Sequence, residues 1–153
     1  MQTVSVNGAQ LRVSIKGPAD SQATVLLFNG AFCNLTMWDA AVPMLNAAGV
    51  RTIAHDCRGV GESFPAPKDI VGSEQFTFEQ YADDAAALLD TLGVKSVVAW
   101  GTAWGARPAM VFVPNLVCAL RHRARTDGVC LYDLTRYLRC ATPRELVASA
   151  CMT

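Results

Sequence analysis

The sequence SVVAWGTAWGA occupies residues 96–106 and joins an apolar run directly to a glycine-rich turn. The run at 96–101 is short and continuous, which predicts a strand buried on both faces of a parallel sheet. A helix is expected to begin near Arg107 and Pro108, because proline suits the first turn of a helix. This strand–turn–helix unit predicts an α/β fold.

The residues before this unit continue the alternation of strands and helices. Short alternating segments at 3–6 and 10–15 flank the turn dipeptide Asn7-Gly8 and predict an antiparallel hairpin. Thr77 and Gln80 form a capping box at the start of a helix that Gly93 ends. The remaining predicted elements are strands at 24–30 and 51–56 and a helix at 38–48.

Three loops follow the predicted parallel strands, at 29–36, 56–64 and 101–105. The carboxyl ends of parallel strands meet at one edge of a sheet, and ligands of such sheets bind beyond that edge. We therefore expect these three loops to form one site.

The turn Gly101-Thr102-Ala103-Trp104-Gly105 resembles the nucleophile elbow, G-x-S-x-G, of the α/β-hydrolase family. Three further segments support the resemblance. Residues 28–32 resemble the family's oxyanion loop, and residues 56–63 resemble its D-x-R-G-x-G-x-S loop. Residues 78–84 resemble the helix that precedes the elbow strand. Together they make residues 1–113 similar to the N-terminal half of an α/β-hydrolase. The implied fold is a partial α/β-hydrolase sheet. It has an N-terminal antiparallel hairpin, then parallel strands with helices on both faces, and it lacks the C-terminal strands.

The resemblance also implies roles for individual residues. Gly101 and Gly105 are the elbow glycines, and Ala103 stands where the nucleophilic serine is expected. A methyl group cannot attack a carbonyl, so this position is non-functional as a nucleophile. By position, the backbone N–H groups of Ala31 and Trp104 form the oxyanion hole.

The rest of a catalytic triad is poorly represented. Asp133 ends a predicted strand at 128–133 and is a weak candidate for the triad acid, with an ordinary strand-end aspartate as the alternative. No histidine follows it in the sequence. His55 is expected to be structural, and His122 is expected on a solvated basic face.

Two functional interpretations remain open. The resemblance implies a cofactor-free ancestral hydrolase of esters or similar small apolar substrates, inactive in this form. The alternative is a non-catalytic pseudo-hydrolase that binds a small apolar ligand or a partner. In both, Ala103→Ser alone is not expected to restore turnover, because no triad histidine follows.

Composition narrows the class of protein. The chain has 153 residues, 52% of them hydrophobic, and a formal net charge of 0, so neither nucleic acid nor a membrane is an expected partner. We expect a single truncated domain with a divergent segment at 114–153. No secretory signal pattern is visible, which predicts a cytoplasmic location.

The cysteines and the sheet edge give the last expectations. None of the six cysteines forms a C-x-x-C pair and the chain has two histidines, so free thiols without a metal site are expected. The resemblance implies that no cofactor is needed. A half-sheet would expose an apolar edge. We therefore expect a truncated gene product, a marginal fold, or a homo-oligomer that covers this edge.

Overall fold

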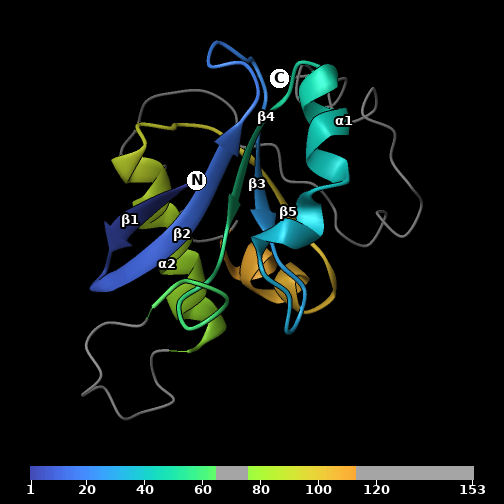
Figure 1. The fold of residues 1–153 in the computed structure, drawn as a ribbon. Helices are drawn as coiled ribbons and strands as arrows, with labels where there is room; N and C mark the ends of the chain where they lie inside the picture. Colours follow the sequence, from blue (N-terminus) through green and yellow to red (C-terminus); the bar gives the residue numbers. More distant parts are fainter. Residues whose placement is uncertain (65–75, 113–153) are drawn as a thin grey trace.

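The computed structural model describes residues 1–64 and 76–112, and these residues contain a five-stranded sheet (Figure 1). The strand order is β1-β2-β4-β3-β5. The hairpin strands pair antiparallel, as do β2 and β4, whereas β3 pairs parallel with both β4 and β5. This confirms the predicted antiparallel start followed by parallel strands. The strands are β1 (Gln2–Val6), β2 (Ala9–Lys16), β3 (Thr24–Phe28), β4 (Arg51–His55) and β5 (Val98–Gly101).

Helices cover both faces of the sheet, as predicted. The short helix η1 (Leu35–Trp38) and α1 (Ala41–Ala47) pack on one face, and α2 (Phe78–Thr91) packs on the other with helical residues 106–112. The central strand β3 supplies both cores because successive side chains of a strand point to opposite faces. Its residues Leu26 and Phe28 join the core under α2, and Val25 and Leu27 join the core under α1.

The predicted start of α2 is confirmed, but only half of its capping box forms. The Thr77 side chain accepts a hydrogen bond from the Gln80 backbone N–H at 3.1 Å. The Gln80 side chain does not return to Thr77; it donates to Asp84 Oδ1 at 3.0 Å. The apolar stripe of this helix is buried as expected, and Asp84 is buried with it.

The predicted helix at 38–48 forms only in part, as α1. The chain forms η1 up to Trp38 and α1 from Ala41, and Asp39 and Ala40 between them keep right-handed helical backbone angles but belong to neither helix. Pro43 explains the break. Its ring would clash with the carbonyl of residue 39 in a helix that started at Trp38, whereas it fits the first turn of a helix that starts at Ala41.

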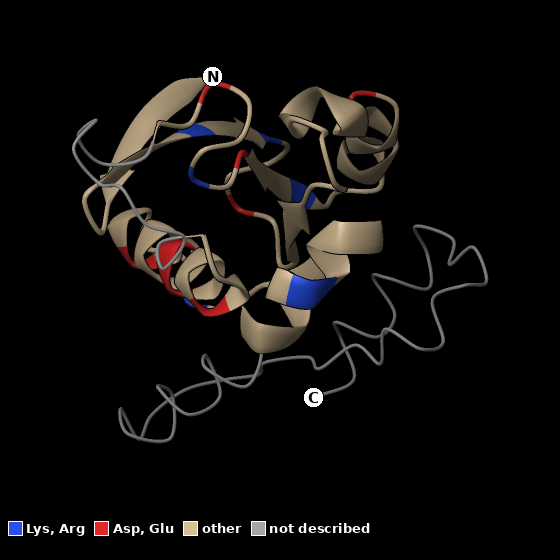
Figure 2. Cartoon of the chain, turned by 90° about the horizontal axis from the view of Figure 1, so that it is seen from below, with Lys and Arg blue, Asp and Glu red and all other residues tan. Residues whose placement is uncertain are grey.

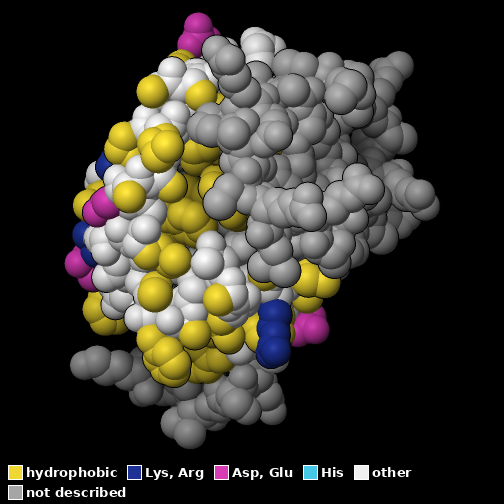
Figure 3. All heavy atoms as spheres, turned by 90° about the vertical axis from the view of Figure 1, so that its right-hand side faces the viewer, with side chains coloured by type: hydrophobic (Ala, Val, Ile, Leu, Met, Phe, Trp, Pro, Cys, Tyr) yellow, Lys and Arg dark blue, Asp and Glu magenta, His cyan; other side chains and the backbone are white. Residues whose placement is uncertain are grey.

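Several predictions fall outside the described residues. They are the segment 114–153, with its strand at 128–133, together with His122 and Asp133. Within the described sheet, β5 has β3 as its one neighbour, and hydrophobic side chains gather on the side of the molecule seen in Figure 3. A homo-oligomer that covers this edge stays a prediction. Among the helices of residues 1–64 and 76–112, none is long and apolar enough to cross a membrane.

Candidate functional site

The turn after β5 has the strained geometry of an elbow. Ala103, at its apex, has a φ of 52°, a left-handed conformation that side-chain-bearing residues rarely adopt. The turn continues as the short helix η3 (Ala103–Gly105) and then as helical residues 106–112. Two backbone hydrogen bonds fix it: Thr102 N–H donates to Phe28 O at 3.3 Å, and Gly105 N–H donates to Thr102 O at 2.9 Å.

Both elbow glycines are required by close backbone contacts. A Cβ on Gly105 would overlap the carbonyl oxygen of Asn29 and lie 2.5 Å from that of Phe28. A Cβ on Gly101 would overlap the Gly105 carbonyl. The turn therefore contacts the ends of β3 and β5 through backbone atoms alone. The side chain at its apex is the exposed methyl group of Ala103.

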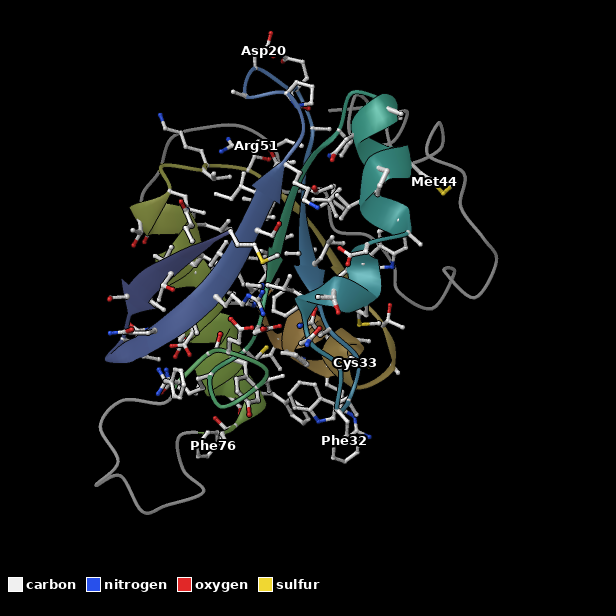
Figure 4. The ribbon with its side chains drawn as sticks, in the orientation of Figure 1. Asp20, Phe32, Cys33, Met44, Arg51 and Phe76 are labelled. Atoms are coloured by element: carbon white, nitrogen blue, oxygen red, sulfur yellow. The ribbon has the colours of Figure 1, made fainter. Side chains whose placement is uncertain are left out.

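The three predicted loops meet at one edge of the sheet and enclose a pocket of about 570 Å³. Phe32 and Cys33 lie at this end of the molecule, opposite Asp20 and Arg51 (Figure 4). Among the described residues that line the pocket, none carries a charged side chain. Figure 2 shows several acidic positions along α2. The lining residues are Asn29, Gly30, Ala31, Phe32, Cys33, Asn34, Cys57, Gly59, Val60, Gly61, Tyr81 and Trp104.

Asn29 connects the loops around this pocket. Its side-chain oxygen accepts a hydrogen bond from Trp38 Nε1 at 2.8 Å. Its amide nitrogen donates to His55 O and to Asp56 Oδ1, both at 3.0 Å. All its side-chain bonds point into the protein, so Asn29 holds the loop after β3 against the loop after β4. Ala31 and Trp104 both line the pocket, and their role as oxyanion donors stays a prediction.

Asp56 organises the loop that follows β4. The carboxylate accepts hydrogen bonds from Leu35 N–H at 2.5 Å and Glu62 N–H at 3.4 Å. Burial raises the pKa of Asp56, and these hydrogen bonds oppose that rise. Gly61 curls against the carboxylate with a φ of 57°, where a Cβ would collide with the Asp56 side chain. Ser63 closes the loop by donating to Asp56 O at 2.7 Å, which is a structural role.

His55 and Cys57 lie on either side of Asp56 and are both buried. Desolvation lowers the pKa of His55 to about 4, so the ring is neutral at pH 7. Desolvation raises the pKa of the Cys57 thiol to about 12, so the thiol stays protonated and unreactive. His55 packs edge-on against Phe28 and does not line the pocket, in agreement with its predicted structural role.

A buried ion pair joins the loop after β4 to α2. Arg58 donates to Asp84 through Nε at 2.6 Å and through an Nη nitrogen at 2.7 Å. Asp84 also accepts from Asn7 Nδ2 at 3.1 Å, and Arg58 donates to Asn7 O at 3.1 Å. The pair thus joins the hairpin turn, the loop after β4 and α2. Sequence reasoning missed it, although Asp84 lies within the apolar stripe of α2, where an aspartate needs a partner.

Aromatic side chains connect the elbow to α2. The Trp104 ring lies 5.3 Å from the rings of Phe78 and Tyr81, measured between centroids. Arg107 lies over the other side of this cluster, 5.7 Å from the Phe78 centroid. The residue after the elbow apex is therefore fixed by packing, and it gives the pocket an aromatic wall.

Comparison with known proteins assigns the family. Residues 23–116 match the alpha/beta hydrolase fold family, and the chain belongs to it. Epoxide hydrolase 2 of Siraitia grosvenorii is 32% identical over 121 residues, which cover 77% of this chain and 36% of that protein. The match confirms the resemblance and the partial α/β-hydrolase fold expected from the sequence.

Solved structures give the same result. A Vigna radiata epoxide hydrolase mutant superimposes with a TM-score of 0.66 at 31% identity, covering 74% of this chain and 34% of that one. Epoxide hydrolase A from Mycobacterium thermoresistibile also reaches 0.66, at 28% identity over 73% of this chain and 34% of its own. The chain spans about a third of the length of these relatives.

Proposed function

We propose that this chain binds a small, uncharged, apolar ligand in the pocket at the elbow and does not hydrolyse it. The observation that carries the proposal is the methyl side chain of Ala103 at the apex of an otherwise complete elbow. Nucleophilic hydrolysis needs an atom with a lone pair at this point, such as a hydroxyl, thiol or carboxylate oxygen. A methyl group has none.

The pocket wall supports an apolar ligand. Its described side chains are uncharged, and three of them are aromatic: Phe32, Tyr81 and Trp104. A wall without charges suits an uncharged molecule, because a charged one would lose hydration without gaining a partner. Similar proteins are named epoxide hydrolases, which favours an epoxide or a related ester as the class of ligand.

The test compares turnover by the parent chain, Ala103→Ser and Ala103→Gly. The glycine variant is the matched control, because it tolerates the apex φ and also lacks a nucleophile. Two substrates are used: p-nitrophenyl acetate, read by nitrophenolate release, and styrene oxide, read by the diol formed. We expect the parent and the glycine variant to match protein-free buffer.

Ala103→Ser is expected to give no gain, because His55, the one histidine in the described part of the chain, is buried away from the pocket. Product formation by the parent above the glycine control would contradict the proposal. A serine-dependent gain would show that the remaining catalytic groups are present.

A further inference from the structure

Tyr81 brings an unused hydroxyl group to the pocket wall. The residue lines the pocket and is only 5% exposed. Within residues 1–64 and 76–112, no group forms a hydrogen bond with its hydroxyl. Buried tyrosine hydroxyls usually have a hydrogen-bond partner, so this one stands out.

Tyr81 forms part of the pocket surface. Among the described residues, the one fully buried side-chain nitrogen or oxygen without a partner is His55 Nδ1. The Tyr81 oxygen is not such an atom, and Tyr81 is one of the residues that line the pocket. A molecule in the pocket can reach it.

The Tyr81 ring is held in place before any ligand arrives. Its backbone N–H donates to Thr77 O at 3.1 Å in the first turn of α2. Its ring packs edge-on against Trp104, with an angle of 64° between the ring planes. Burial raises the pKa of Tyr81, so the phenol stays protonated and acts as a donor at neutral pH. A donor fixed in this way loses little conformational entropy on binding.

We propose that the Tyr81 hydroxyl donates a hydrogen bond to an oxygen atom of the ligand in this pocket. The site then selects uncharged apolar molecules that carry an ether, epoxide or carbonyl oxygen over hydrocarbons of the same shape. This inference rests on the proposed function, since it takes the pocket as a ligand site. It adds the residue that discriminates between ligands.

A matched pair of probes tests the inference. Styrene oxide and phenylcyclopropane have nearly the same shape, and they differ in one ring atom, oxygen in the first and carbon in the second. Dissociation constants are measured by tryptophan fluorescence for the parent and for Tyr81→Phe, which removes only the hydroxyl. We expect the parent to prefer styrene oxide by about three- to tenfold, the range for one net hydrogen bond. Tyr81→Phe should bind both probes equally.

The outcomes separate the two proposals. If both probes bind and Tyr81→Phe keeps the preference of the parent, the role of Tyr81 is wrong while the ligand pocket stands. If neither probe binds the parent, the proposed function fails, and this inference fails with it. A urea midpoint of Tyr81→Phe that equals that of the parent shows that the variant is folded, as expected for a hydroxyl that no described residue hydrogen-bonds.

Discussion

Removing the Asp84 carboxylate should strongly destabilise the chain. Asp84 accepts four hydrogen bonds: two from Arg58, one from Asn7 and one from Gln80. In Asp84→Ala, Arg58 keeps a single acceptor, Asn7 O, although its side chain is only 3% exposed. Breaking a buried pair by removing one partner typically costs about 3–5 kcal/mol, because the remaining charge is left uncompensated.

The assay is urea unfolding followed by circular dichroism. With a slope of about 2 kcal/mol per molar urea, the midpoint of Asp84→Ala should fall by roughly 2 M. The matched control is Asp83→Ala, an exposed aspartate one position away on the same helix, which should change the free energy of unfolding by less than about 0.5 kcal/mol. If the parent has low stability, Asp84→Ala should already be unfolded in buffer. That outcome also agrees with the predicted loss of unfolding free energy.

A double variant distinguishes an unpaired charge from lost packing. Arg58→Met combined with Asp84→Leu removes both charges and keeps apolar volume, so it should recover at least half of the loss. The reasoning is refuted if Asp84→Ala stays within about 1 kcal/mol of the parent, or if the double variant is less stable than Asp84→Ala.

Three further predictions follow from the site. Gly105→Ala should lower the free energy of unfolding by more than about 2 kcal/mol, because the new Cβ meets backbone atoms at the end of β3. Gly49→Ala should lower it less, because a Cβ there meets no atom within 4 Å. Equal losses in urea unfolding would contradict this. Folding lowers the pKa of His55 from 6.5 to about 4, so between these values the unfolded chain binds a proton that the folded chain does not. The free energy of unfolding is therefore highest above pH 6.5 and decreases as the pH falls toward 4. His55→Leu should reduce the dependence of the unfolding free energy on pH in this window by up to about 1.4 kcal/mol per unit, and an unchanged slope would count against the burial of a neutral ring. Iodoacetamide at pH 8 should leave Cys57 unmodified until the chain is unfolded, because its pKa near 12 keeps the thiolate scarce; peptide mass mapping that finds the folded chain labelled there would overturn this.

Local patterns predicted most of the fold. The apolar runs of β3, β4 and β5 and the stripe of α2 are visible in short windows of sequence, and each forms where expected. The elbow glycines were also predictable, because their spacing alone marks a turn with close backbone contacts. The broken helix at 38–48 had a local signal too, in Pro43, which cannot occupy the interior of a helix that starts at Trp38.

Contacts between distant segments could not be predicted in this way. The Arg58–Asp84 pair joins residues 26 positions apart, and the bond from Asn29 to Asp56 joins residues 27 apart. Arg58, Asn29 and Asp56 each fit a solvated loop. The place of Asp84 in the apolar stripe of α2 indicates that it needs a partner without saying which residue that is. Only the parallel pairing of β3 with β4, and the packing of α2 beneath the loop, bring them together. The polar framework of the pocket is therefore a tertiary property.

We propose that the pocket beside the elbow binds a small apolar molecule and does not turn it over. The most direct test is one NMR titration of the ¹⁵N-labelled chain with styrene oxide. We expect saturable shifts confined to amides of the pocket residues, at 29–34, 57–61, 81 and 104, with no diol signal above the rate in buffer. Diol that accumulates in the tube, or the absence of saturable shifts in these loops, would contradict it.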